Sequence, residues 1–200
     1  MFSQIIGKIC KSILDLIVAA AAALRISPNL LTLAGFLVTI VSATYLARGK
    51  FFQAGLIIIL AGIFDMLDGR VARTTQNVTQ FGAFFDSVLD RYSDIAMFLG
   101  LIVYYSKGQR LAYVVLSGIA MVGAVMTSYT RARAESLIPL CKVGFMERPE
   151  RMVLLILGTL TDRMAPVLWV MAFFSDLTVV HRIAYTWKET SRLKPIVSSQ

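Results

Sequence analysis

Four aspartates at helical spacing stand out in this chain for their chemistry. Asp65 and Asp68 are three positions apart, and Asp86 and Asp90 are four apart, so each pair shares one helix face. Both pairs lie in otherwise apolar stretches, where a carboxylate is costly unless it has a function. Carboxylates packed together repel each other unless a cation neutralises them, and oxygen ligands suit Mg²⁺ or Mn²⁺. The spacing therefore predicts a two-metal site of the kind that stabilises a phosphoryl displacement.

Small residues and one arginine accompany these aspartates. Gly69 and Ala72 follow Asp68 on the same helix, and Gly82 stands at the start of the next one. Such small side chains leave room for a nucleotide and its metal ions to lie close to the backbone. Arg73 adds a positive charge suited to a pyrophosphate. We therefore expect a nucleotide site beside the aspartates.

A structural interpretation of the aspartates is the alternative. In that interpretation they are helix-end charges in the lipid headgroup region, paired with nearby arginines, namely Arg70, Arg73 and Arg91. This explains any single aspartate, but it accounts less well for four that converge beside small residues. Asp94 continues the row from Asp90 and is left open between supporting the site and forming a structural ion pair.

The elements that must carry these residues are membrane helices. Hydrophobic residues make up 57% of the 200 residues, and the mean hydropathy is +0.71, too apolar for an ordinary soluble domain. Uncharged runs at 26–47 and 111–130 are each long enough to cross a bilayer. We expect an all-α integral membrane protein with a single domain over residues 1–200. Its six transmembrane helices are expected at about 30–47, 51–73, 81–105, 111–135, 148–161 and 164–186.

Residues 3–24 are expected to form an amphipathic interfacial helix before the first span. Lys8, Lys11 and Asp15 stand at helical spacing among isoleucines and leucines, a pattern typical of a helix that lies on the bilayer surface. A seventh span here would bury three charges in lipid.

The net charge of +8 indicates orientation in a membrane better than it indicates nucleic-acid binding. If six spans have both ends in the cytoplasm, fifteen of the twenty Lys and Arg residues fall on the cytoplasmic side, as cytoplasmic loops favour. The five on the opposite side are Arg48, Lys50, Lys107, Arg110 and Arg163. We therefore expect a multi-pass protein of the cell membrane whose aspartates face the cytoplasm.

The aspartates belong to a longer motif, Asp65-x-x-Asp68-Gly69-x-x-Ala72-Arg73, eight residues, then Gly82-x-x-x-Asp86-x-x-x-Asp90. This motif resembles the signature of the CDP-alcohol phosphotransferase family at every specified position. The resemblance implies that two Mg²⁺ or Mn²⁺ ions bind at the four aspartates and that Asp90 is the general base. It also implies homodimers and a site for a CDP-activated lipid lined by Asn29, Leu30, Leu31, Thr32, Gly69, Ala72, Arg73, Thr79 and Gly82. The acceptor hydroxyl would give its proton to Asp90 and attack the lipid-linked phosphorus, releasing CMP.

A second group of charged residues, within 128–135 and 142–151, bears on the acceptor. Arg148 and Arg151 share a helix face, whereas Arg131 and Arg133 point to different faces, so that only one of these two should reach a pocket directly. Several arginines at one cavity suit an acceptor that itself carries phosphate. Contact with lipid headgroups is the alternative. The residues expected to bind the acceptor are Ser128, Arg131, Arg133, Arg148 and Arg151.

These segments resemble the phosphatidylinositol-phosphate synthase branch of that family. The resemblance implies CDP-diacylglycerol as donor, inositol 1-phosphate as acceptor, and phosphatidylinositol phosphate with CMP as products. Glycerol 3-phosphate, the acceptor of a phosphatidylglycerol-phosphate synthase, is the runner-up. A transporter or a non-catalytic membrane scaffold is the alternative of a different class. A transporter is expected to carry its polar residues at the bilayer midplane, whereas these lie near one face.

Overall fold

The computed structural model describes residues 15–192, and all regular elements among them are helices, which confirms the all-α prediction. A helical segment at 15–23 comes first. It is followed by α2 (Pro28–Ala47), α3 (Phe51–Thr74), α4 (Gln80–Lys107), α5 (Leu111–Glu135), α6 (Arg148–Leu160) and α7 (Met164–Arg192). These bounds lie close to the expected ones, except that α7 continues past residue 186 to Arg192.

Four helices, α2, α3, α5 and α7, are long and apolar enough to cross a membrane, as expected of a multi-pass membrane protein. The other two depart from that pattern for different reasons. α4 has the length but carries several charges, including Asp86, Asp90, Arg91 and Asp94. α6 has only 13 residues and begins with a charged turn. The count of six spans therefore stays a prediction.

The expected interfacial helix is only partly within the described residues, because residues 3–14 lie outside them. The described part packs on the end of the bundle that holds the aspartates. Val18 and Ala21 are buried against Leu31 of α2 and Val71 of α3. Whether this helix lies at a membrane surface stays a prediction.

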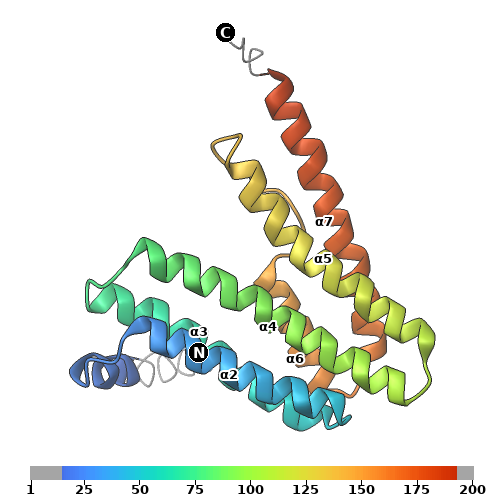
Figure 1. Cartoon of the computed structure of the whole chain (residues 1–200), viewed down its shortest axis with the longest axis horizontal. Helices are drawn as coiled ribbons and strands as arrows, with labels where there is room; N and C mark the ends of the chain where they lie inside the picture. The colour runs from blue at the N-terminus through green and yellow to red at the C-terminus, as the bar shows by residue number, and fades with distance from the viewer. Residues whose placement is uncertain (1–14, 193–200) are drawn as a thin grey trace, which may run out of the picture.

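The helices form two groups that diverge from each other (Figure 1). α2 packs against both α3 and α4, and α5 pairs with α7 while also contacting α4. Short α6 packs against α3 on one side and α7 on the other. The start of α6 can therefore bring its charged first turn to the place where the two groups meet.

Close helix packing holds α4 beside α2. The main core is built from apolar side chains of all six helices, with Leu46, Ile58, Phe98 and Leu101 almost fully buried. A Cβ atom on Gly100 would lie 2.5 Å from the carbonyl oxygen of Ala43. Only glycine permits this approach of the two backbones.

Two hydroxyl caps and a docked loop fix the helix starts around the aspartates. Leu30 donates its N–H to Ser27 Oγ at the start of α2, and Gly82 donates its N–H to Thr79 Oγ1 at the start of α4. The loop before α6 is held on α7, because two successive backbone N–H groups, of Phe145 and the next residue, donate to Thr178 Oγ1 at 3.0 Å each.

Candidate active site

Three of the four predicted aspartates come together where α3 faces α4. Carboxylate oxygens of Asp65, Asp68 and Asp86 all lie within 4.8 Å of one another. Thr32 of α2 donates a 2.6 Å hydrogen bond to Oδ2 of Asp68, which holds that carboxylate in place. Oδ1 of Asp86 is buried and has no hydrogen-bond partner among residues 15–192. An oxygen-only cluster with an unpartnered carboxylate oxygen fits a divalent cation such as Mg²⁺ or Mn²⁺.

Asp90 stands apart from this three-aspartate cluster and pairs with an arginine of α6. Nη2 of Arg148 lies 2.9 Å from Oδ1 of Asp90. Nη1 of the same guanidinium donates to both oxygens of Asp65, at 3.1 and 3.0 Å. Arg148 therefore joins the expected base to the expected metal site.

Within the described residues, Arg70, Arg73 and Arg91 form no ion pair with the four predicted aspartates. Arg70 forms its ion pair with Asp15, at 3.0 Å, and Arg91 donates to Ser87 one turn earlier on α4. Arg73 lies beside Gly69 on its own helix. The ion pairs of Asp65 and Asp90 therefore come from Arg148 of α6, and not from the helices that carry these aspartates.

A cavity of about 300 Å³ opens beside Asp68 and Asp86, and we call it the Gly69 cavity. The predicted residues that line it are Asn29, Thr32, Gly69, Ala72, Arg73, Thr79 and Gly82. Leu30 and Leu31 do not line it, since Leu30 is 55% exposed and Leu31 is buried against α3. On a helix only positions three or four apart share a face, so Asn29 and Thr32 reach the cavity and the two leucines between them do not. Four further residues line this cavity and were not in the set predicted from the sequence, namely Pro28, Asn77, Val78 and Ala83.

A second cavity, of about 430 Å³, lies between α4, α5, α6 and α7, and we call it the arginine cavity. Ser128, Arg131, Arg148 and Arg151 line it as expected, and Asp90 lies on its wall. Arg133 does not reach it. Two positions beyond Arg131 on α5, it donates to Ser136 and lines a separate groove against α7. The expectation that only one of these two arginines reaches the pocket agrees with this geometry.

Ion pairs, one of them fully buried, hold the walls of the arginine cavity. Arg151 is 1% exposed, and its Nη2 lies 2.5 Å from Oδ2 of Asp94, while its Nη1 donates to Thr127 Oγ1. Asp94, which the sequence leaves open, thus forms a structural ion pair. Glu147 accepts from Arg182 of α7 at 2.7 Å and from Arg131 of α5 at 3.0 Å.

Arg182 is the functional candidate that sequence reasoning missed. From the sequence it counts only toward the cytoplasmic charge at the end of the last helix. In the structure it is 2% exposed, lines the arginine cavity and donates to the backbone carbonyl of Val143 as well as to Glu147. The available signal was its place inside a long apolar helix, where a charged residue is costly without a role.

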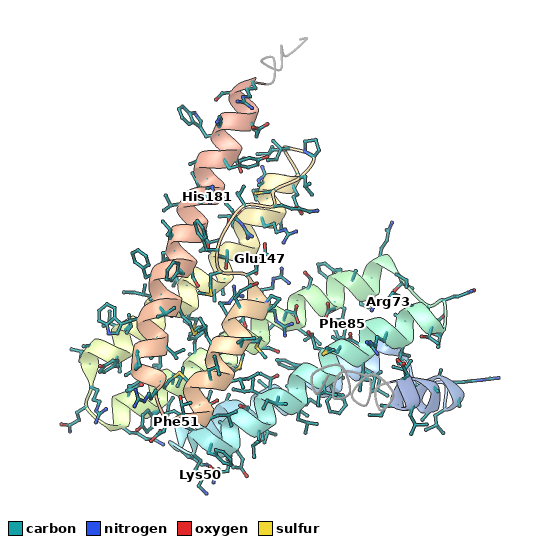
Figure 2. The ribbon with its side chains drawn as sticks, turned by 180° about the vertical axis from the view of Figure 1, so that it is seen from behind. Lys50, Phe51, Arg73, Phe85, Glu147 and His181 are labelled. Carbon is teal, nitrogen blue, oxygen red and sulfur yellow. The ribbon has the colours of Figure 1, made fainter. Side chains whose placement is uncertain are left out.

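The two cavities meet at the aspartates. A small cavity of about 20 Å³ is lined by Asp65 and Asp68 on one side and by Asp90 and Arg148 on the other. Asp68 also lines the Gly69 cavity, and Asp90 and Arg148 also line the arginine cavity. Figure 2 shows Arg73 near the end of α3 and Glu147 near α5 and α7. The small cavity therefore shares lining residues with both larger cavities.

Comparison with known proteins gives consistent matches. A family model described as CDP-alcohol phosphatidyltransferase matches residues 25–187. The archaetidylinositol phosphate synthase of Methanothermobacter thermautotrophicus is 35% identical over 165 residues, which cover 79% of this chain and 82% of that protein.

Two crystal structures of the phosphatidylinositol phosphate synthase of Mycobacterium tuberculosis are similar to this chain at 29% sequence identity. The structure with CDP-DAG bound has a TM-score of 0.82, and the match covers 88% of this chain and 94% of that one. The complex with manganese and citrate has a TM-score of 0.79, with 88% of that chain and 87% of this one covered.

Proposed function

This chain belongs to the CDP-alcohol phosphatidyltransferase family, and we propose that it transfers the phosphatidyl group of CDP-diacylglycerol to inositol 1-phosphate. The products are phosphatidylinositol phosphate and CMP. The observation that carries this proposal is a small cavity that shares Asp68 with the Gly69 cavity and shares Asp90 and Arg148 with the arginine cavity. One cavity adjoins the three-aspartate cluster, as a CDP site requires, and the other is lined by arginines, as a phosphorylated acceptor requires.

The donor half comprises the Gly69 cavity and the three-aspartate cluster. We assign Asp65, Asp68 and Asp86 as ligands of Mg²⁺ or Mn²⁺, with Asp90 next to the second ion. When bound, the ions supply positive charge to the pyrophosphate and to the departing phosphate of CMP. The CDP moiety is assigned to Asn29, Thr32, Gly69, Ala72, Arg73, Thr79 and Gly82, all of which line the cavity. A similar enzyme binds CDP-DAG, which supports this assignment.

Asp90 acts as the general base in this proposal. It accepts the proton of the acceptor hydroxyl, whose oxygen forms a bond to the lipid-linked phosphorus while the bond from phosphorus to the CMP oxygen breaks. Arg148 holds the Asp90 carboxylate from the side of α6, at 2.9 Å, so that it stays aimed at the junction of the cavities. Most of the rate enhancement then comes from positioning of the two substrates and from charge neutralisation.

The acceptor half uses the arginine cavity. We assign the acceptor phosphate to Ser128, Arg131, Arg148, Arg151 and Arg182, and we leave out Arg133 because it lines a different groove. Planar guanidinium groups bind phosphate oxygens in pairs, and these guanidinium groups are already held by carboxylates of the cavity wall. Inositol without its phosphate would offer these guanidinium groups no anion to bind.

The membrane arrangement is part of the proposal. Residues 1–200 are taken as one domain with an interfacial helix and six spans, in the cell membrane, and the chain is taken to form homodimers. The site gathers at the end of the helices that carries most of the Lys and Arg residues, which supports an active site facing the cytoplasm. The transporter and scaffold alternatives do not account for a chain of this enzyme family.

An acceptor panel tests this function directly. Purified protein is supplied with CDP-diacylglycerol, Mn²⁺ or Mg²⁺, and one alcohol at a time, either inositol 1-phosphate, glycerol 3-phosphate or free inositol. CMP release and the lipid product, identified by mass spectrometry, should be found with inositol 1-phosphate. A preference for glycerol 3-phosphate would make the chain a phosphatidylglycerol-phosphate synthase. Activity with free inositol alone would contradict the role given to the arginine cavity.

A further inference from the structure

A basic cavity lies at the end of the bundle opposite the aspartates. This far cavity measures about 510 Å³, and its wall includes Arg48, Tyr104, Tyr105, Lys107 and Arg110. These residues surround the turn between α2 and α3 and the turn between α4 and α5. In Figure 2, Lys50 and Phe51 mark this end of α3 and Arg73 marks the other. At 1.5 Å per residue, Phe51 and Asp65 are about 20 Å apart along α3, so the far cavity is separate from the proposed active site.

The three cations of the far cavity have no acidic partner. Within residues 15–192, Arg48, Lys107 and Arg110 form no ion pair. In the arginine cavity, by contrast, Arg131, Arg148, Arg151 and Arg182 each pair with a carboxylate. Asp162, on the turn after α6, lies near Tyr105 but does not line the far cavity. Like charges that share one wall repel each other, and a bound anion removes that repulsion.

A tyrosine adds a polar group to the same wall. Tyr105 lines the far cavity, and the residue as a whole is 3% exposed. Its ring is fixed by stacking on Tyr113, with the ring centroids 5.0 Å apart. A tyrosine hydroxyl can donate a hydrogen bond, so its place on the cavity wall suits a ligand with acceptor oxygens such as a phosphate.

The turn that carries Arg48 is built to hold its shape. Gly49 has a φ of +71°, a conformation that favours glycine. A Cβ atom at this position would lie 2.6 Å from Cε2 of Tyr104. The Tyr104 ring is held in turn by Phe51, with ring centroids 4.8 Å apart. Packing among these residues therefore holds the aromatic wall of the far cavity in place.

We propose that the far cavity binds the phosphate of an anionic lipid headgroup in the leaflet opposite the active site. The cavity lies where apolar helices α2, α3 and α5 end, which is where headgroup phosphates gather. Phe52 and Leu111 stand next to its basic turns and are 57% and 74% exposed, which offers an apolar surface to the acyl chains of the same lipid. This surface favours a lipid over free phosphate. Such a lipid is neither the donor nor the acceptor of the proposed reaction. It contacts both the α2–α3 turn and the α4–α5 turn.

Lipid binding to matched variants tests the proposal. The protein is purified in uncharged detergent, and phosphatidylglycerol, phosphatidylcholine or inorganic phosphate is added. Bound lipid is measured by native mass spectrometry and the melting temperature by thermal unfolding. The test variant is the triple substitution Arg48→Gln, Lys107→Gln and Arg110→Gln. The control variant is Lys50→Gln with Arg163→Gln, which removes basic residues of the same end that do not line the cavity. Tyr105→Phe is the milder variant if the triple variant unfolds.

The expected result is selective loss of phosphatidylglycerol binding. Each cation near a headgroup contributes about a fivefold gain in affinity, so the triple variant should bind about a hundredfold more weakly, while the control stays near the native protein. Tyr105→Phe should bind more weakly without a change in CMP release. Equal binding by the triple and control variants would overturn the proposal. So would a rise in melting temperature with inorganic phosphate as large as that with phosphatidylglycerol, because it would show that the site takes free phosphate.

Discussion

Arg148 Nη2 lies 2.9 Å from Asp90 Oδ1, and this contact joins two parts of the chain that the sequence places in separate motifs. Asp90 ends the aspartate motif on α4, and Arg148 begins α6 in the arginine-rich segment. Because Nη1 of Arg148 also binds Asp65, one guanidinium touches the proposed base, the three-aspartate cluster and the arginine cavity. In the proposed mechanism, the donor and acceptor sites therefore share the Arg148 side chain.

Asp90→Asn should abolish transfer while leaving the fold intact. The amide has nearly the shape of the carboxylate but cannot accept the proton of the acceptor hydroxyl. A positioned base contributes about a hundredfold to ten-thousandfold in rate, so CMP release should fall by at least about a hundredfold. The melting temperature should change little, since Arg148 keeps its contact with Asp65. CMP release by the Asn variant at the native rate would show that Asp90 is not the base.

Arg131 and Arg133 offer a matched pair on one helix for the acceptor site. Arg131→Gln should raise the KM for inositol 1-phosphate by about tenfold, the effect of one charge-assisted contact to phosphate. Arg133→Gln should leave that KM near its native value, because Arg133 lines the groove against α7. Initial rates measured over a range of acceptor concentrations give both constants. A larger effect from Arg133 than from Arg131 would contradict the assignment of the arginine cavity.

The Asp94–Arg151 pair should matter most for stability. Asp94→Asn leaves Arg151 buried at 1% exposure without its charge partner, which costs about 3–5 kcal/mol of unfolding free energy. The double variant Asp94→Asn with Arg151→Met should recover part of that loss. The exposed pair Glu189–Arg192 is the control, and Glu189→Gln there should cost less than about 1 kcal/mol. Thermal unfolding in detergent measures all three, and equal effects of Asp94→Asn and Glu189→Gln would refute a buried pair.

Manganese should stabilise the protein through the three-aspartate cluster. With free Mn²⁺ at about a hundred times its dissociation constant, binding to the folded state adds about 2.7 kcal/mol and raises the melting temperature. Asp86→Asn should remove most of this rise, because Asp86 supplies an otherwise unpartnered oxygen. Asp15→Asn, in the exposed pair with Arg70, should keep it. A chelator should abolish CMP release by the native protein. A rise in melting temperature that survives Asp86→Asn would locate the metal elsewhere.

Much of the fold and of the proposed donor site could be predicted from residue spacing along the chain. Apolar runs and breaks such as Pro28 predict helix bounds because they act within a few residues. The aspartate motif predicts the cluster because Asp65 and Asp68 share a helix face and a short loop returns the chain to Asp86. The error at Leu30 and Leu31 has the same basis, since a contiguous segment was assigned where only one face of α2 reaches the cavity.

Contacts between residues far apart in the sequence could not be predicted from local spacing. Arg148 meets Asp90, and Arg182 meets Glu147, only because α6 packs between α3 and α7. Nothing in the spacing of either segment specifies this arrangement. Arg182 also looks like an ordinary end-of-helix charge until the docking of the 136–147 loop on Thr178 covers it.

Gly100 has a consequence for how defects in this enzyme would be recognised. It lies on α4 several turns from Asp90, and its contact with Ala43 sets how closely that helix can approach α2. An alanine there would force the backbones apart and tilt α4, so Asp86 and Asp90 would move relative to Thr32 and Arg148. A genetic screen for loss of lipid synthesis would then recover a mid-bundle glycine alongside the aspartates.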